Sequence, residues 1–398
     1  MRVAGWFGLV AEIADGESLR DRFNGTVEVM ALGDSLDQAR FEESPQASPF
    51  HPARPVGENS TMEEPMSPNS VTMVDGYVPV IDIAARHDES GRAALAEAIG
   101  RACRTSGFFV IVGHGIPSEL IDRMHTATTT FFTQPDAEKD RFASRPGFSG
   151  FRRSGGTTAQ SLDRRTPPDL CESFGAHVTG ELGDREREAL GDYWATWKLA
   201  NLWPRTPADF KDTWQEYMAA IHALAADLLH LCARALGLAE DHFDDRFDRH
   251  VSSLVANFYY PQVDEPLPNQ LRRGAHTDFG GLTVLYQQDD KGGLQVLQGE
   301  DTWRDVRAIP DSFVINIGDL MALWTGGRWV STMHRVVNPE RADTSSRLSI
   351  PFFFQPNHDA EIDPLPPLSP VANQQPPQSV IAGEWMAMKT QKLFAPAQ

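Results

Sequence analysis

Apolar residues follow different patterns in three consecutive parts of this chain. In residues 1–75 they show no regular period, and residues 34–72 are rich in Ser, Pro, Glu and Asn with few large apolar side chains. Such a segment cannot bury enough apolar surface to offset the entropy lost on ordering, so we expect residues 1–75 to be a disordered leader. Met73 stands just before the periodic sequence begins, and translation from Met73 is an alternative explanation of the leader.

The second part, residues 76–200, mixes short apolar runs with helical periods. Leu95, Ile99 and Cys103 recur at four-residue steps, which predicts a helix between two short strands. Ser118 opens a second helix of the same kind. We interpret this part as the N-terminal portion of a larger fold that contains both helices and strands.

The third part, residues 201–398, begins with the longest predicted helix and continues as short strands. Residues 207–237 place large apolar side chains mostly three or four positions apart, which predicts one buried stripe, and Gly237 ends the helix. Beyond it the apolar runs are short and punctuated by Gly, Pro and Asp, until residues 379–394 return to a helical pattern. The predicted strands cover residues 254–260, 281–288, 294–298, 303–307, 313–317, 334–337 and 347–355.

Many short strands after a helical leader predict an α+β fold with a double-stranded β-helix core, a jelly roll of the cupin-like kind. N-terminal helices precede this core, and the long helix packs on one of its sheets. A barrel of this kind is wide at one end, which provides a mouth for a metal and a ligand.

Composition and charge narrow the classes of partner. The chain has 398 residues, with 36 basic against 55 acidic side chains and a net charge of −19. This balance argues against nucleic acid and against an anionic membrane surface, since both need a basic face. No apolar run approaches the roughly 20 residues of a membrane span. Three widely spaced cysteines fit a reducing cytoplasm. We therefore expect a cytoplasmic monomer or weak homo-oligomer that binds a small molecule.

Four arginines stand out in this acidic chain. Arg152, Arg153, Arg164 and Arg165 lie in residues 146–180, a Gly- and Arg-rich region without a strong period. They are either solvated loop residues or a basic lip that orients an acidic or carbonyl-bearing substrate.

The residues with the strongest chemical signal lie near the C-terminal end. His276 and Asp278 are alternate residues of an extended segment, so their side chains point the same way, and His334 would complete a set of two imidazoles and one carboxylate. That set leaves one side of an octahedral ion open, as non-haem Fe(II) oxygenases require. Arg347 and Ser349 alternate in the same way, and a guanidinium beside a hydroxyl suits a carboxylate. Each piece alone is weak, but their order and spacing together predict an iron site with a carboxylate clamp.

These residues lie in a run, from Gly274 to Phe354, that resembles the core of the 2-oxoglutarate- and Fe(II)-dependent dioxygenase superfamily. The likeness is to the branch that contains isopenicillin N synthase, flavonoid and gibberellin oxidases and deacetoxycephalosporin C synthase, and it extends over roughly Tyr77 to Phe394. The matching segments are Val78-Pro79-Val80-Ile81-Asp82, Gly107-Phe108-Phe109, His114-Gly115-Ile116, Ala275-His276-Thr277-Asp278, Leu282-Thr283-Val284-Leu285, Gly292-Gly293-Leu294-Gln295-Val296, Asn316-Ile317-Gly318-Asp319, His334-Arg335-Val336-Val337 and Arg347-Leu348-Ser349-Ile350-Pro351-Phe352-Phe353.

The resemblance implies an enzyme that oxidises a small organic metabolite by hydroxylation, desaturation or ring closure. Fe(II) would be held by the two histidines and the aspartate, and 2-oxoglutarate and O2 would be cosubstrates, with release of succinate and CO2. The resemblance also implies that Arg347, Ser349 and Tyr260 bind the distal carboxylate of 2-oxoglutarate and that Phe353 contacts the substrate. Asn257 lies near a family asparagine but one residue out of register.

Three other functions stay open at this point. An oxidase like isopenicillin N synthase shares the fold, the metal ligands and the Arg-x-Ser clamp but does not use 2-oxoglutarate. A cupin-type binding protein would need no complete set of metal ligands. A zinc hydrolase could use two histidines and an aspartate but would need no carboxylate clamp. The identity of the prime substrate does not follow from the sequence.

Overall fold

The computed structural model of the chain describes residues 71–74, 77–144, 149–155, 167–288, 291–340, 345–365 and 378–394. All of these residues belong to one unit, which spans residues 64–398. The leader predicted for residues 1–75 lies outside the described residues, except for a short strand at 71–74. Arg164 and Arg165 also lie outside them.

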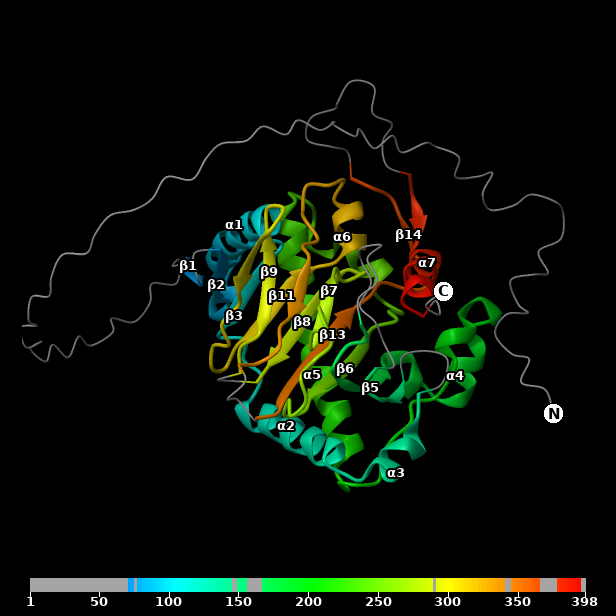
Figure 1. The fold of residues 1–398 in the computed structure, drawn as a ribbon. Helices are drawn as coiled ribbons and strands as arrows, with labels where there is room; N and C mark the ends of the chain where they lie inside the picture. The colour runs from blue at the N-terminus through cyan, green and yellow to red at the C-terminus, as the bar shows by residue number, and fades with distance from the viewer. Residues whose placement is uncertain are drawn as a thin grey trace, which may run out of the picture. The chain divides into compact units, whose positions relative to one another are not determined.

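Nine strands form the larger of two facing sheets (Figure 1). Their order is β1-β2-β3-β11-β8-β13-β6-β5-β4, and only the pair β2 and β3 is parallel. The strands are β1 Val71–Val74, β2 Val78–Asp82, β3 Phe108–Val112, β11 Phe313–Ile317, β8 Leu282–Gln287, β13 Arg347–Phe354, β6 Ser253–Tyr259, β5 Glu172–His177 and β4 Gly150–Arg152.

Four strands form the smaller sheet, in the order β10-β9-β12-β7. An apolar cluster fills the space between the sheets, with Val110 and Val314 from the larger sheet and Val296 and Val336 from the smaller one. Two mainly antiparallel sheets packed over a shared core are the jelly roll that the strand pattern predicts, so the predicted fold class is confirmed. The strands are β10 Thr302–Asp305, β9 Leu294–Gln298, β12 His334–Val336 and β7 Arg273–His276.

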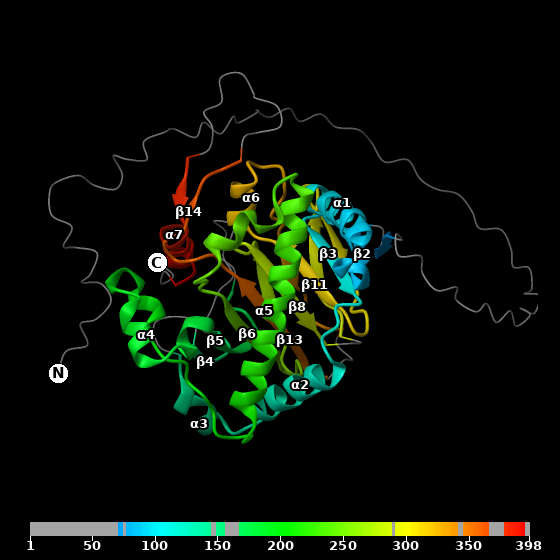
Figure 2. The same ribbon diagram turned by 180° about the vertical axis from the view of Figure 1, so that it is seen from behind.

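The opposite face of the larger sheet is covered by helices (Figure 2). The long helix α5, Phe210–Ala235, contacts β8 and β13 and buries its predicted stripe, including Trp214, Ile221 and Leu228. It begins three residues later than the sequence pattern predicts and ends before Gly237, whose φ of +75° suits glycine. Among the described helices, α5 alone is long and apolar enough to cross a bilayer, and half of that stretch is buried inside the protein.

Shorter elements complete the described part of the chain. Helices α1 and α2 pack on α5, and α7 follows the small hairpin of β14 and β15. The remaining helices are α1 Glu89–Thr105, α2 Ser118–Phe132, α3 Asp136–Lys139, α4 Asp184–Ala189, α6 Asp319–Trp324 and α7 Ala382–Phe394, with 3-10 turns at Ala84–His87, Asp140–Phe142, Val178–Glu181, Asp192–Trp197 and Glu240–Arg246; β14 is Glu361–Ile362 and β15 is Val380–Ile381.

Strands β4 and β5 extend the larger sheet where the sequence pattern shows no period. All six residues of β5 are buried, so the alternation of apolar and polar side chains that marks a half-exposed strand is absent. Of the two alternatives considered for residues 146–180, solvated loops do not describe β4 and β5, which are strands of the sheet. Their position matters because β5 pairs with β6, the strand next to the one that begins with Arg347.

Candidate metal centre

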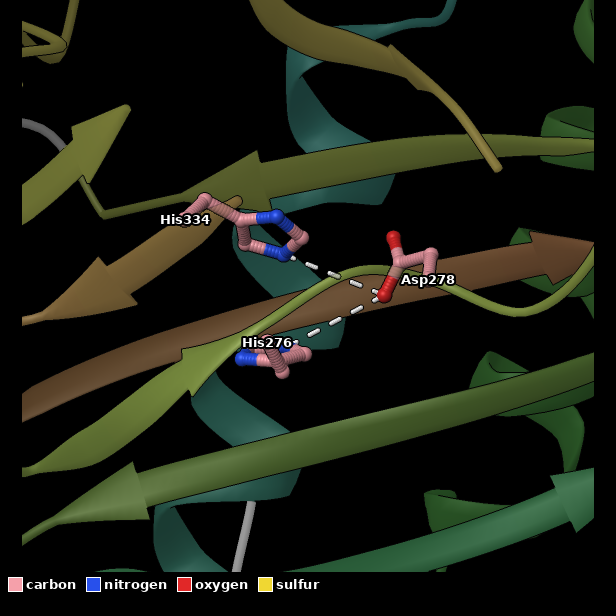
Figure 3. Close-up of side chains that lie close together, drawn as sticks. All are labelled: His276, Asp278 and His334. Atoms are coloured by element: carbon pink, nitrogen blue, oxygen red, sulfur yellow. Dashed lines mark ion pairs between the residues drawn. The ribbon is translucent and has the colours of Figure 1, made fainter. Parts of the chain in front are cut away.

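The three candidate metal ligands meet at the open end of the smaller sheet (Figure 3). His276 is the last residue of β7 and His334 the first of β12, and these two residues lie opposite each other in the antiparallel pair. Asp278 follows β7 by two residues. The ligand atoms of all three residues lie within 4.8 Å of one another.

Backbone carbonyl groups orient both imidazole rings. Nδ1 of His276 donates a hydrogen bond of 2.8 Å to the carbonyl of Gly274, and Nδ1 of His334 donates one of 3.1 Å to the carbonyl of Thr332. With the proton on Nδ1, the lone pair of each ring is on Nε2. The two Nε2 atoms lie 3.9 and 3.8 Å from the same oxygen, Oδ1 of Asp278. Such outer hydrogen bonds fix the tautomer and orientation that a metal needs.

The carboxylate of Asp278 uses its second oxygen for protein contacts. Oδ2 accepts hydrogen bonds of 2.6 Å from Oγ1 of Thr283 and 2.7 Å from Nδ2 of Asn316. Thr283 lies opposite Asn316 in the β8–β11 pair. Both residues belong to matched segments of the sequence, but nothing in their spacing assigned them to Asp278. The pairing of β8 with β11 brings Thr283 and Asn316 next to Asp278.

The electrostatic environment prepares these residues for a cation. Burial, and then the neighbouring His334, lowers the pKa of His276 to about 3, so its imidazole is neutral at physiological pH. Burial raises the pKa of the Asp278 carboxyl, but His334, His276 and the two hydrogen bonds outweigh that effect and lower the pKa overall. A neutral imidazole and an ionised carboxylate are the forms that bind metal.

The two residues of the predicted carboxylate clamp are buried. Arg347 is 1% exposed, and its Nη1 atom has no hydrogen-bond partner within the described structure. Ser349 is also buried, two residues along β13 on the same face. A buried guanidinium nitrogen without a partner is costly, and a ligand carboxylate would satisfy it.

The tyrosine beside Arg347 is Tyr259, whereas Tyr260, which the resemblance assigns to this place, lies elsewhere in the structure. Tyr259 lies opposite Arg347 in the β6–β13 pair, is 1% exposed, and has its ring centroid 5.1 Å from Cζ of Arg347. Ser349 lies opposite Asn257, so both β6 residues face the clamp. Successive residues of an extended chain point to opposite sides, which turns Tyr260 away.

The hydroxyl of Tyr260 belongs to a separate polar cluster. It lies 2.7 Å from Nζ of Lys139, from Oε2 of Glu172 and from the carbonyl of Phe132. Lys139 also donates to Glu172 at 2.6 Å. Burial lowers the pKa of Lys139, but the hydrogen bonds to Glu172 and Tyr260 outweigh it and raise the pKa to about 12. The cluster ties α2 and α3 to β5 and β6 and makes no contact with Arg347.

Phe353 is on the same side of β13 as the clamp. It is half-buried and lies opposite Thr283, the residue that donates to Asp278. Because directly opposed residues share a face of the sheet, the Phe353 ring faces the metal side.

The turn that carries Asp278 is held from behind by α6 and α7. Lys389 of α7 donates a 2.6 Å hydrogen bond to Oδ2 of Asp319, and Thr277 donates one of 3.2 Å to the same oxygen. The backbone N–H of Asp319 donates to the carbonyl of Asp278 at 2.7 Å, and Trp385 donates to the carbonyl of Phe279 at 2.9 Å. The sequence pattern predicts the helix at residues 379–394 but not these contacts.

The donor set fits an octahedral Fe(II) ion. Two neutral imidazoles and one carboxylate are the ligands that such ions take in non-haem oxygenases, and the three side chains occupy one side only. The orphaned Nη1 of Arg347 and the adjacent Ser349 fit the carboxylate of a dicarboxylic cosubstrate.

Comparisons with known families and proteins agree with this arrangement. Residues 251–356 match the 2OG-Fe(II) oxygenase superfamily, and residues 78–206 match the family described as non-haem dioxygenase in morphine synthesis N-terminal. Validamycin A dioxygenase of Streptomyces hygroscopicus subsp. limoneus is 34% identical over 322 residues, covering 79% of this chain and 86% of the relative. The 2-oxoglutarate-Fe(II) type oxidoreductase hxnY of Emericella nidulans is 35% identical, covering 72% and 82%. Homoarginine-6-hydroxylase 2-ODD-C23.2 of Arabidopsis thaliana is 33% identical, covering 74% and 82%.

Solved structures with the same fold include enzymes crystallised with the cosubstrate. A full-length Neurospora crassa protein in complex with alpha-KG superposes with a TM-score of 0.68 at 25% identity, covering 80% of this chain and 97% of that one. A putative 2OG-Fe(II) oxygenase family protein from Caulobacter crescentus gives a TM-score of 0.68 at 26% identity, covering 79% and 99%.

Proposed function

The chain belongs to the 2OG-Fe(II) oxygenase superfamily, and from that premise we propose that His276, Asp278 and His334 bind its Fe(II). The protein is an Fe(II)- and 2-oxoglutarate-dependent oxygenase that oxidises a small organic molecule with O2 and releases succinate and CO2. We assign the distal carboxylate of 2-oxoglutarate to Arg347 and Ser349.

One observation supports the assignment of the metal ligands more strongly than any other. Both Nε2 lone pairs converge on the side of Asp278 Oδ1, while every other polar atom of the three side chains that the structure describes is engaged with the protein. A cluster whose free donor atoms all face one point is what a single cation requires.

The residues around the metal have separable tasks. Iron bound here would supply O2 activation and removal of hydrogen from an unreactive C–H bond, with 2-oxoglutarate providing two electrons as it breaks down to succinate and CO2. Thr283 and Asn316 hold Asp278 in one orientation. Arg347 neutralises the distal carboxylate, and Tyr259 in place of Tyr260 packs against its guanidinium. Phe353 lines the substrate side and keeps water from the reacting bond.

The proposal also covers the partners, the oligomeric state and the cellular location of the enzyme. A net charge of −19 supports a protein without nucleic-acid or membrane partners, acting as a monomer or weak homo-oligomer. Three free, buried cysteines support a cytoplasmic location. The named relatives act on dissimilar compounds, since one is a validamycin A dioxygenase and another a homoarginine-6-hydroxylase, so family membership does not select the substrate.

Replacement of the metal ligands tests the assignment. We expect His276→Ala, Asp278→Ala and His334→Ala each to abolish succinate formation and to weaken Co(II) binding, while the melting temperature of the metal-free protein stays near that of the wild type. Asp278→Glu should also fail, because one methylene moves the carboxylate by about an ångström.

The control is His87→Ala, which removes an exposed histidine from a 3-10 turn. It should keep both metal binding and succinate formation. Near-normal Co(II) affinity in any ligand variant would remove that residue from the set.

A further inference from the structure

Two arginines face the space between the sheets from opposite sides. Arg152 ends β4 and lies opposite Ser173 of β5, which lies opposite Asn257 of β6, which lies opposite Ser349 of β13. Directly opposed residues of antiparallel strands project to the same face. Arg152 therefore shares the inner face of the larger sheet with the carboxylate clamp.

The second arginine comes from the smaller sheet. Arg273 is in β7, three residues before His276. Its Nη1 lies 3.5 Å from Oδ2 of Asp169 and 3.9 Å from Sγ of Cys171. Both neighbours belong to the segment that leads into β5, so the guanidinium reaches toward the region of Arg152.

The two guanidinium groups are close enough to repel each other. Burial, and then the charge of Arg273, lowers the pKa of Arg152 to about 10. Both residues are half-buried, and the side chain of Arg273 is 23% exposed, so a small ligand can reach them. An anion bound between them would offset both the repulsion and the loss of solvation.

Arg152 is separate from the 2-oxoglutarate clamp, whereas Arg273 is near enough to Tyr259, the tyrosine packed on Arg347, to interact with it electrostatically. Arg152 is three strands away from Ser349, a distance of roughly 14 Å at the usual spacing of about 4.8 Å between strands. Arg273, by contrast, is on the same strand as a proposed metal ligand. A group held by this pair therefore lies on the metal side of the site, where the substrate of the oxidation must sit.

We propose that Arg152 and Arg273 bind a carboxylate of the prime substrate, so that the enzyme acts on a small organic acid. This inference rests on the proposed function, because the ligand is the molecule that the same site oxidises. The planar guanidinium fork of Arg152 matches the two oxygens of a carboxylate.

The neighbouring Arg153 provides a matched control. Its side chain is 47% exposed and pairs with Asp136 and Asp140 on the outer surface. Replacing either arginine removes the same charge from adjacent positions, but only Arg152 is on the inner face.

The test compares carboxylic acids with their own primary amides. A panel of small aliphatic and aromatic acids, each paired with its amide, is titrated anaerobically into the full chain loaded with Fe(II) and 2-oxoglutarate, and dissociation constants are measured by calorimetry. In the wild type we expect at least one acid to bind roughly 30-fold or more tightly than its amide, the usual cost of removing one partner of a buried charge pair. Arg152→Gln should abolish that preference and leave the affinity for the amide in place, whereas Arg153→Gln should keep the preference.

Arg152→Lys keeps the test informative if the Arg152→Gln variant does not fold. It retains the positive charge but not the planar guanidinium, so it should retain part of the preference for acids over amides. The proposal is overturned if the wild type shows no preference for acids, if Arg152→Gln weakens acid and amide equally, or if the two glutamine variants behave alike.

Succinate formation, measured separately in air, distinguishes the two proposals. If acids bind through Arg152 but no compound supports succinate formation, the proposed function is contradicted while the proposed anion site is supported. If succinate forms and amides serve as well as acids, the anion site alone fails.

Discussion

The two oxygens of Asp278 have different surroundings, and this difference is central to the metal site. Oδ2 is held by Thr283 and Asn316 in β8 and β11, while Oδ1 faces the Nε2 atoms of His276 and His334. Partners of this kind commonly change metal affinity by 10- to 100-fold when they are removed. The large sheet thus fixes the one ligand that lies beyond the end of a strand.

Asn316→Ala should therefore weaken Co(II) binding by about 10-fold or more, because Asp278 loses one of its two orienting donors. The measurement is a titration of the metal-free protein with Co(II), followed by absorption. Asn338→Ala, a change to a half-buried asparagine whose Nδ2 donates to the carbonyl of Gln270, is the control. Equal affinities for the wild type and Asn316→Ala would show that Thr283 alone suffices.

Tyr259 and Tyr260 are adjacent, but replacing each of them should affect a different property of the enzyme. Tyr259→Phe should raise the KM for 2-oxoglutarate by about tenfold, because its hydroxyl is close to the charged clamp, and should change stability little. Tyr260→Phe should lower the free energy of unfolding by about 1 kcal/mol, because Lys139 and Glu172 lose a part-buried hydrogen-bond partner, and should leave that KM unchanged.

Steady-state kinetics and urea unfolding of both variants check this pair. A raised KM for Tyr260→Phe with a normal value for Tyr259→Phe would restore the prediction made from sequence.

Tyr260 lies away from the predicted clamp because of the register in which β6 pairs with β13. Tyr260 precedes Pro261, which made it the residue to align with the family tyrosine, and this alignment left Asn257 one place out of register. The pairing of β6 with β13 places Asn257 and Tyr259 on the clamp face instead. The sequence alone does not show which of the two adjacent tyrosines faces the clamp.

Helices and strands differ in how well the sequence predicted them. The stripe of α5 carries a clear helical period, and the short strands from β8 to β13 stand out as apolar runs punctuated by Gly, Pro and Asp. Strands β4 and β5 have no such apolar pattern in the sequence. The placement of Arg152 on the inner face follows only from their pairing with β6.

The C-terminal helix α7 should contribute to metal affinity, although it holds no ligand. Lys389→Met removes the partner of Asp319, whose carboxylate and backbone N–H contact Thr277 and Asp278. We expect Co(II) affinity to fall several-fold and Lys389→Arg to retain most of it, because the charge is kept. Met388→Ala, at an exposed site on the same helix, is the control.

Unchanged Co(II) affinity in Lys389→Met, together with a lower melting temperature, would assign Lys389 to stability alone.

For the protein as a whole, the net charge is negative, but the arginines at the site make its local charge positive. The chain carries −19 overall, yet Arg347 is buried at the site and Arg152 and Arg273 lie beside it. Focused positive potential within an acidic protein suits anionic ligands and still disfavours polyanions such as nucleic acid. The sequence predicted the jelly roll and brought the metal-ligand candidates together, because those segments follow family spacing. It did not predict contacts that no family motif specifies, such as those of Lys389 with Asp319 and of Lys139 with Glu172.

The most direct measurement of the central claim is a titration of 2-oxoglutarate against wild type and Arg347→Ala, with succinate quantified and Co(II) affinity measured in parallel. The wild type should form succinate in a saturable manner. Arg347→Ala should raise the KM for 2-oxoglutarate by on the order of 100-fold, since removing one partner of a buried charge pair costs about 3 kcal/mol, and Arg347→Lys should recover only part of the loss. Metal affinity should not change. Wild-type protein that forms no succinate from 2-oxoglutarate, or a KM that is unaffected in Arg347→Ala, would contradict the account.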